Sequence, residues 1–259
     1  MKIKVFEAFA GYGSQAMALQ RLKEDYPDFD YEVVGISEID KFVVQAYEAV
    51  HGHCPNYGDI SKIDWNNVPD FDLFTYSTPC QDFSQAGLQK GGEEGSGTRS
   101  SLLWECRKAI QIKRPQFLLM ENVKALTSKK FLPLFNKWLA ELESYGYQNF
   151  WKILDTKDFG IPQHRERTFC VSILADYAHY EFPKPFPLEL RIKDVLEENV
   201  DEKFYLSDKM LQYFLRVNED QSHCHNFNPL GGEDTAFTIR TRAGQRVDDN
   251  FVKDVQENP

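Results

Sequence analysis

Cys80 is the residue of this sequence best placed for nucleophilic chemistry. It lies in the string Thr-Pro-Cys-Gln-Asp-Phe-Ser at residues 78–84, after an apolar run at residues 71–76. A cysteine at the carboxyl end of a buried strand occupies the edge of an α/β sheet where such folds place their chemistry. Pro79 fixes its own φ and holds the preceding residue extended, so the thiol has a defined direction. Most lone cysteines inside cells are instead small buried hydrophobic residues, so position alone does not decide.

A glycine turn and a carboxylate predict a second site. Gly11 and Gly13 follow an expected strand at residues 2–9, and their missing side chains let a cofactor approach the amino terminus of the next helix. Glu38 follows a second expected strand, where a carboxylate accepts hydrogen bonds from both ribose hydroxyls of an adenosine. Together these residues favour a nucleoside cofactor, although a lone Gly-x-Gly turn also occurs where a helix merely packs on a strand.

Glu121, Arg165 and Arg167 are the remaining residues whose side chains are suited to catalysis. Glu121 ends a continuous apolar run of the kind that is buried on both faces of a parallel sheet, so it is expected to face the same crevice as Cys80. The structural alternative is an acid that caps the next turn. Arg165 and Arg167 alternate on the approach to an expected strand, so both guanidinium groups are predicted on one face, where they suit a base carbonyl and phosphates. A surface ion pair with Glu166 is the structural alternative.

Strands and helices alternate over the first two thirds of the chain. This order predicts a doubly wound, mostly parallel, Rossmann-like α/β sheet with right-handed crossovers. Three prolines within residues 182–187 place a boundary between a domain at 1–182 and an appendage at 183–259. The expected helices are 15–22, 41–50, 100–112, 130–145 and 208–216, and the expected strands are 2–9, 31–37, 72–77, 117–120, 150–154 and 169–174.

Composition limits the class of protein. The 259 residues are 42% hydrophobic, with 20 Phe and 12 Tyr, which supplies a sizeable core and excludes global disorder. No apolar run reaches the roughly 18 residues that a membrane crossing needs, and the amino terminus lacks a secretory pattern, so a cytoplasmic protein is expected. Five scattered cysteines suggest neither a disulfide framework nor a zinc site.

The charge pattern bears on nucleic-acid binding. A net charge of −10 argues against a protein that coats nucleic acid by bulk electrostatics, so any DNA-binding surface must be local. Residues 107–130 hold seven Lys and Arg against the single acid Glu121. This stretch is either such a surface or simply a solvated face.

Four strings in order make the pattern specific: Phe-Ala-Gly-Tyr-Gly at 9–13, Pro-Cys-Gln-Asp-Phe-Ser at 79–84, Glu-Asn-Val at 121–123 and Gln-His-Arg-Glu-Arg at 163–167. With them the chain resembles the cytosine-5 DNA methyltransferases over residues 4–175. The resemblance implies methyl transfer from S-adenosylmethionine to a cytosine flipped out of double-stranded DNA. Cys80 would add to carbon 6, and Glu121 would act beside ring nitrogen 3.

The resemblance also assigns further roles. Arg165 and Arg167 would help to hold the ring and the catalytic loop, while the glycine-rich residues 87–97 would close as a lid. The cofactor pocket would comprise Phe9, Gly11, Gly13, Glu38, Ile39, Asp59, Ile60, Pro79 and Leu102. DNA contacts would come from Gln81, Ser84, Arg99 and Gln163. Ser14 departs from the family, which often has a third glycine there, but serine is small and can cap a helix.

Three alternatives stay open. A relative acting on transfer RNA has similar catalytic strings. An inactive, truncated DNA-binding homologue is disfavoured, because the four catalytic candidates are intact. A Rossmann oxidoreductase would explain the glycine turn but not Pro79-Cys80-Gln81.

The resemblance fades towards the carboxyl terminus. The family normally continues into an Arg-rich block and an Asn-containing block whose helix returns to the first strand, and neither is recognisable in residues 188–259. We therefore expect that a second polypeptide supplies these blocks or that they have been lost. We also expect exposed apolar surface near Phe6, Phe9 and the helix after Gly13. The DNA recognition sequence and the biological setting, restriction protection or phage defence, do not follow from the residues.

Overall fold

The computed structural model describes residues 2–79, 99–219, 227–239 and 249–253. The chain divides into two compact units. The first contains Met1–Ile153 and Arg167–Phe182, and the second contains Leu154–Glu166 and Pro183–Pro259. The expected boundary after residue 182 is also a division between the units. However, residues 154–166, which the sequence places in the first domain, belong to the second unit.

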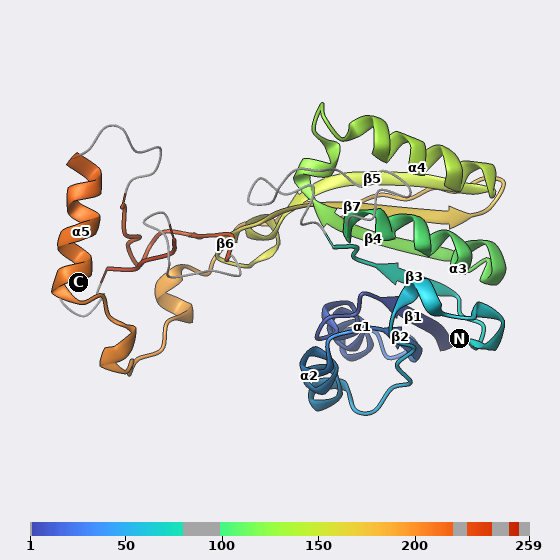
Figure 1. Ribbon diagram of the computed structural model, residues 1–259, viewed down its shortest axis with the longest axis horizontal. Coiled ribbons are helices and arrows are strands. Elements are labelled where there is room, and N and C mark those ends of the chain that lie inside the picture. Colours follow the sequence, from blue (N-terminus) through green and yellow to red (C-terminus); the bar gives the residue numbers. More distant parts are fainter. Residues whose placement is uncertain (1, 80–98, 220–226, 240–248, 254–259) are drawn as a thin grey trace. The chain divides into compact units, whose positions relative to one another are not determined.

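The first unit is built on a six-stranded sheet with the strand order β2-β1-β3-β4-β7-β5 (Figure 1). Strands β2, β1, β3 and β4 are parallel, whereas β7 runs antiparallel to β4. The predicted mostly parallel, Rossmann-like sheet is therefore confirmed. The strands are β1 (Lys2–Ala8), β2 (Asp30–Ser37), β3 (Leu73–Tyr76), β4 (Phe117–Val123), β5 (Tyr147–Asp155) and β7 (Glu166–Leu174).

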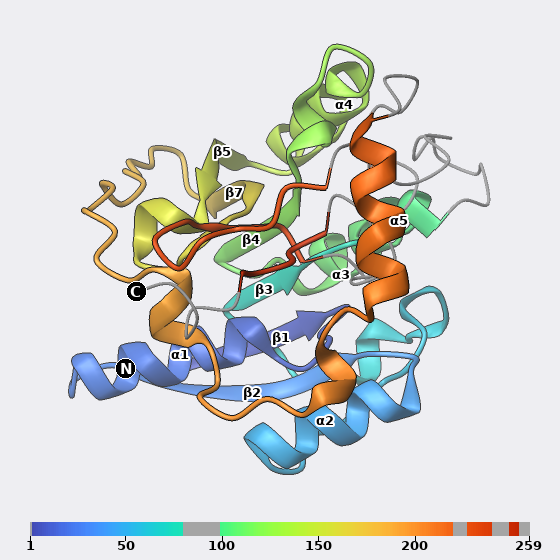
Figure 2. The same cartoon turned by 90° about the vertical axis from the view of Figure 1, so that its left-hand side faces the viewer.

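Helices cover both faces of this sheet. The crossover from β1 to β2 runs one way along the sheet and the crossover from β3 to β4 runs the other way, so right-handed connections put their helices on opposite faces. Accordingly, α1 and α3 lie on opposite sides in Figure 2. The α1 and α2 face buries a small core around Ile36 and Tyr47, and the α3 and α4 face buries a larger one around Phe74 and Trp138. The helices are α1 (Ser14–Asp25), α2 (Lys41–His51), α3 (Cys106–Lys113) and α4 (Leu132–Ser144).

Several elements differ in their bounds from the sequence expectations: β4 continues to Val123 and β7 begins at Glu166. The helix expected at residues 100–112 is divided into a 3₁₀ segment, Arg99–Glu105, followed by α3. Such tighter turns are frequent at the amino termini of α-helices. Strand β5 begins at Tyr147 rather than residue 150, because the Tyr147 hydroxyl donates to Pro115 O at 2.7 Å and Gln148 Nε2 donates to Asp176 O at 2.6 Å. The first residues of β5 include polar side chains, so a prediction based on apolar runs places the start of this strand too late.

The expected exposed apolar surface is only partly present. Phe6 is 0% exposed, so that expectation was wrong: β1 is a central strand, and Phe6 packs against four aromatic rings of the larger core. Phe9 is partly buried against the same core. The outer side of the glycine turn and α1 does expose Tyr12, Met17 and Leu22.

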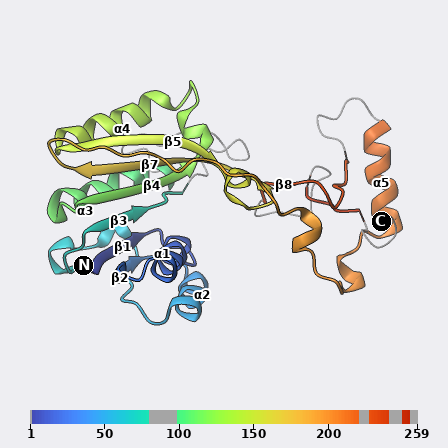
Figure 3. The ribbon, with the colours of Figure 1, turned by 180° about the vertical axis from the view of Figure 1, so that it is seen from behind.

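The second unit has little regular structure. It contains α5 (Asp208–Glu219) and a two-stranded parallel sheet formed by β6 (Gln163–His164) and β8 (Ala236–Phe237), labelled in Figures 1 and 3. Phe214 of α5 packs at 5.2 Å from the Phe227 ring and 5.3 Å from the Phe251 ring, measured between centroids. In the described parts of the chain, no helix combines the length and apolar character that a membrane crossing requires.

Candidate active site

The ends of three parallel strands define the candidate site. Ala8 of β1 lies beside Tyr76 of β3, which lies beside Met120 of β4, so the residues that follow these strands meet at one edge of the sheet. The glycine turn, Thr78 and Glu121 share this edge. Cys80, Gln81, Ser84 and the expected lid at 87–97 lie outside the described residues, as does the side chain of Arg99.

Asn122 holds the segment that leads to Cys80. Its side chain is buried, and Nδ2 donates to Thr78 O at 3.2 Å and to Thr78 Oγ1 at 3.0 Å. Its Oδ1 accepts from Val123 N at 2.9 Å. With its amide engaged on both sides, Asn122 holds Thr78 against the end of β4.

Glu121 and Arg167 form an ion pair across β4 and β7. Arg167 Nε lies 3.1 Å from Glu121 Oε1, and both side chains are largely buried. The antiparallel register makes this possible, because Val123 lies opposite Arg167 and Glu121 is two residues back along β4. The pair orients the Glu121 carboxyl group at the edge of the sheet that Thr78 shares.

Arg165 is placed differently. It lies between β6 and β7 rather than within one strand, and it belongs to the second unit, whereas Arg167 belongs to the first. Among the described residues, the structure pairs Glu121 with Arg167, and the common face of the two arginines stays a prediction. Gln163 lies in β6, again in the second unit.

The glycine turn has the backbone geometry of a ligand cradle. Phe9, Gly11 and Gly13 have φ values of 56°, 59° and 84°, and a positive φ at a non-glycine residue such as Phe9 is concentrated at functional sites. A Cβ added at Gly13 would lie 2.7 Å from Tyr47 Cε2, so no side chain fits there. A Cβ added at Gly11 would meet no atom of the described residues within 4 Å. The space over Gly11 is therefore open to a ligand.

Glu38 ties this turn to the end of β2. Its Oε2 accepts from Gly11 N at 3.1 Å, and its Oε1 accepts from Ile39 N at 2.8 Å and Asp40 N at 3.0 Å. A carboxylate has about four acceptor positions, so about one, on Oε2, is left for a ribose hydroxyl. The carboxylate is thus both a structural clamp and a candidate ligand group.

The remaining residues predicted to bind the cofactor differ in how far their side chains are buried. Ile39 is 78% exposed and Ile60 is 3% exposed within the larger core, so only the Ile39 side chain is free to cover a ligand. Asp59 accepts from the hydroxyl and the backbone N–H of Ser61, and these bonds lower the pKa of Asp59. Pro79 and Leu102 are partly buried. The open space at Gly11 and the free acceptor on Glu38 fit the adenosine and amino-acid parts of S-adenosylmethionine.

The described cysteines are unsuited to nucleophilic attack. Cys54, Cys106 and Cys170 are free and buried. Burial raises the pKa of Cys54 to about 11, raises that of Cys170 to about 12, and raises that of Cys106 as well. Because the thiolate is the nucleophile, these thiols are inert near neutral pH.

The basic stretch at residues 107–130 has two parts. Its first three cations form ion pairs within the chain, Arg107 with Glu141, Lys108 with Glu105 and Lys113 with Asp70. Lys124, Lys129 and Lys130, which follow β4, are exposed. The cations on α3 therefore have structural partners, whereas those beyond the carboxyl end of β4 are known here by their exposure alone.

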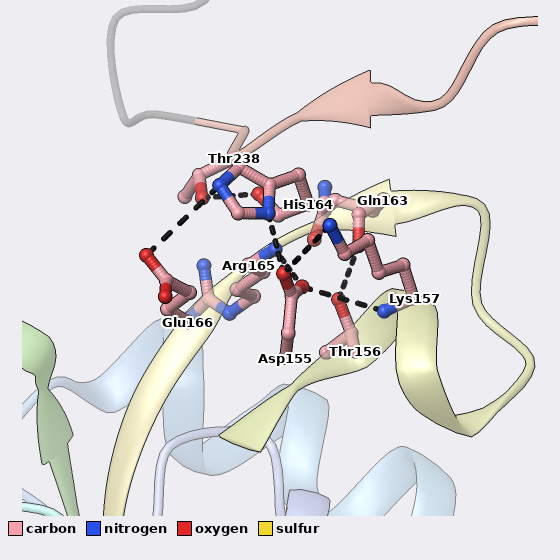
Figure 4. A network of polar contacts seen from close by, with 8 residues as sticks. All are labelled: Asp155, Thr156, Lys157, Gln163, His164, Arg165, Glu166 and Thr238. Atoms are coloured by element: carbon pink, nitrogen blue, oxygen red, sulfur yellow. Dashed lines mark hydrogen bonds and ion pairs between the residues drawn. The ribbon is translucent and has the colours of Figure 1, made fainter. Parts of the chain in front are cut away.

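A network that the sequence did not predict surrounds Gln163 and Arg165 in the second unit (Figure 4). Asp155, the last residue of β5, is 8% exposed. Its Oδ1 accepts from Arg165 N at 2.9 Å and Lys157 N at 3.4 Å, while Oδ2 contacts His164 Nδ1. Burial alone would raise the pKa of Asp155, but the Arg165 N–H, the His164 ring and the Lys157 N–H outweigh it and lower the pKa. The only sequence signal is an Asp-Thr pair that can cap a turn.

Comparison with known proteins decides the family. The family model for C-5 cytosine-specific DNA methylase matches residues 3–253. The chain belongs to this family. It is 44% identical to the type II methyltransferase M2.ScrFI of Lactococcus lactis subsp. cremoris, over 81% of this chain and 71% of the relative.

Two further proteins are similar to this chain. The orphan methyltransferase M.SssI of Spiroplasma monobiae is 34% identical over 89% of the chain and 74% of the relative. The S. pombe Dnmt2 methyltransferase structure superimposes with a TM-score of 0.65 over 90% of this chain and 69% of its own, at 20% identity. The last likeness shows the fold.

Proposed function

We propose that this methylase transfers a methyl group from S-adenosylmethionine to carbon 5 of a flipped-out cytosine in double-stranded DNA. The observation that carries the proposal is the edge of the sheet where Asn122 holds the segment leading to Cys80 beside the Glu121–Arg167 pair. The open glycine turn with Glu38 shares this edge. A restriction–modification setting in the cytoplasm is favoured by the type II relatives.

The mechanism follows from the chemistry of the ring. Carbon 5 of cytosine is not nucleophilic in the intact ring, and addition of the Cys80 thiolate to carbon 6 makes it enamine-like. The cofactor supplies the electrophilic methyl group when it is bound. Glu121 stabilises or neutralises the charge on ring nitrogen 3, and Arg167 keeps its carboxyl group aimed. A proton then passes from carbon 5 to water, and the Cys80 sulfur leaves carbon 6 as a thiolate, which restores the ring.

Binding of DNA would use the exposed cations beyond β4. Lys124, Lys129 and Lys130 lie in the segments that follow the strand bearing Glu121. A local cluster of this kind reconciles DNA binding with a net charge of −10, because phosphate contacts need only a few cations near the site. Participation of a second polypeptide stays a prediction.

The test is methyl incorporation with labelled S-adenosylmethionine into duplex DNA and, separately, into transfer RNA. Incorporation into DNA is expected, with loss of activity in Cys80→Ser and retention in the matched control Cys54→Ser, a buried thiol of the smaller core. DNA carrying 5-fluorocytosine at the target should give a denaturation-resistant adduct, because fluorine cannot leave as a proton. Incorporation into transfer RNA alone would favour the RNA-modifying alternative, and incorporation into neither would sink the proposal.

A further inference from the structure

The connection between β5 and β7 fixes the backbone on both sides of Arg165. Thr156 Oγ1 donates to Gln163 O at 2.6 Å, and Thr156 N donates to Arg165 O at 3.2 Å. Asp155 Oδ1 accepts from Arg165 N at 2.9 Å. The neighbouring pair Asp155-Thr156 therefore satisfies Gln163 O and both backbone groups of Arg165 (Figure 4).

The carboxylate of Asp155 also fixes the His164 ring. His164 Nδ1 pairs with Asp155 Oδ2, and His164 Nε2 lies 3.9 Å from Glu166 Oε2. Because Asp155 holds the His164 ring, that side chain cannot rotate freely. The backbone at His164 then sets the direction of the next side chain, that of Arg165. Side chains project from adjacent residues on opposite sides of an extended chain, so the Arg165 side chain is directed away from the side on which the His164 ring is held.

The same segment is joined to β8. Thr238 Oγ1 donates to His164 O at 2.9 Å, and Ala236 N donates to Pro162 O at 2.8 Å. The segment that carries Gln163 and Arg165 is thus bound on one side by Asp155-Thr156 and on the other by β8, both from the second unit. Because β6 is only two residues long, the side-chain bonds from Asp155, Thr156 and Thr238 add to the backbone bonds that place this segment.

We propose that Asp155 is a positioning residue for Arg165 in methyl transfer, holding the Arg165 backbone and the His164 ring so that the guanidinium group reaches the target nucleotide. This inference rests on the proposed function. It assigns no contact between Asp155 and the substrate, since Asp155 acts through the residues that it orients. Without its carboxylate, Arg165 would still be present but would sample several directions, and a misplaced group lowers the rate of the chemical step.

A matched control separates positioning from ordinary turn capping. Asp201 caps a 3₁₀ turn in the same unit in the same way, accepting from Lys203 N at 3.0 Å and Lys203 Nζ at 2.8 Å. Asp155 likewise accepts from Lys157 N, with Lys157 Nζ at 3.6 Å. Asp155 has in addition the bonds to Arg165 and His164. Loss of a cap alone would therefore affect the two variants equally.

The experiment compares kcat and KM for methylation of duplex DNA in the full chain and its variants. We expect Asp155→Ala to lower kcat about 10- to 100-fold, with S-adenosylmethionine affinity within about twofold of wild type. Asp155→Asn keeps an oxygen acceptor for Arg165 N and should recover a large part of kcat. Asp201→Ala should leave kcat within about twofold. Thr156→Val, which removes only the bond to Gln163 O, is a second, milder variant if Asp155→Ala does not fold.

A double-mutant cycle identifies Arg165 as the group through which Asp155 acts. In an Arg165→Lys background, which keeps the charge but loses the guanidinium fork, the loss caused by Asp155→Ala should shrink to less than about threefold. Equal losses in both backgrounds, or equal losses for Asp155→Ala and Asp201→Ala, would overturn the inference alone. A wild type that methylates no DNA would overturn the proposed function and this inference together.

Discussion

The first unit and the second unit are each stabilised internally by a different kind of interaction. In the first unit, two apolar cores lie on the two faces of a sheet whose strands pair along their length. In the second unit, where the described strand pairing is limited to β6 and β8, asparagine side chains also bond the backbone. Asn218 and Asn250 each bond both backbone groups of one residue, Phe227 and Phe237 respectively. A unit with a small core thus depends on individual polar side chains, whereas the sheet unit depends on area buried.

The largest effect is expected on the free energy of unfolding when an aromatic ring is removed from the core of the first unit. Trp138 is 0% exposed, lies edge-on to Tyr76 and Trp104, and donates from Nε1 to the Tyr76 hydroxyl at 3.2 Å. Trp138→Ala should lower the free energy of unfolding by about 3–5 kcal/mol, because the cavity cannot close. Urea denaturation followed by far-ultraviolet circular dichroism measures it.

Trp151 is the matched control for Trp138. It contacts the same core through Phe135, with ring centroids 5.6 Å apart, but is 42% exposed. Trp151→Ala should cost about 1 kcal/mol, since much of its surface is already in water. Equal losses for the two variants would mean that burial does not determine the stability of the sheet unit.

The second prediction concerns Glu38, a carboxylate at the end of β2 that accepts from backbone N–H groups in the first unit, as Asp155 does in the second. Glu38→Ala should weaken S-adenosylmethionine binding by roughly 1.5–3 kcal/mol, because the ribose loses a charged acceptor and the Gly11 N–H is released. Calorimetry measures the affinity. Asp40→Ala is the control, since Asp40 caps α2 through Phe42 N and Val43 N. Unchanged affinity in Glu38→Ala would leave Glu38 with a structural role only.

These differences explain which features the sequence could predict. The apolar periodicity of β4 and α4 reports burial directly, so the sheet and its helices were predicted with shifts of a few residues. The Glu121–Arg167 pair depends on β7 running antiparallel to β4, and no local pattern encodes a strand's direction. Asp155 has no periodic signal at all, because its partners are backbone groups near it and about ten residues further along the chain.

The third prediction tests the role of asparagine in the second unit. Asn218 Nδ2 donates to Phe227 O at 2.8 Å, and Asn218 Oδ1 accepts from Phe227 N at 2.6 Å. Asn218→Ala should destabilise this contact by about 1–2 kcal/mol, at roughly 1 kcal/mol or less per bond. Hydrogen exchange at the Phe227 amide should accelerate about 5- to 30-fold. Gln212→Ala, on the exposed side of the same helix, should leave that exchange unchanged; acceleration in both variants would count against a specific role.

The smallest expected effect is a pH dependence of opposite sign in the two units. Glu7 is fully buried in β1, with Ala16 N at 3.0 Å and the Tyr47 hydroxyl at 2.6 Å, and burial raises its pKa in spite of these bonds. A raised pKa in the folded state gives stability that is complete below the usual value of 4.5 and is lost as pH rises through the folded pKa. The lowered pKa of Asp155 gives stability that is present above 3.8 and is lost as pH falls through the folded pKa.

Isosteric amides separate the two contributions. Stability is measured by urea denaturation between about pH 3 and pH 7. The wild type should lose stability as pH rises through the folded pKa of Glu7, and Glu7→Gln should not, because the amide does not ionise. Asp155→Asn should instead remove a decline on the acid side, because the lost carboxylate no longer has to be protonated. Proteolysis at sites within each unit assigns each change to its unit. If stability falls more steeply with decreasing pH in Asp155→Asn than in wild type, the Asp155 carboxylate does not favour the folded second unit. The predicted opposite pH dependence of the two units would then be wrong.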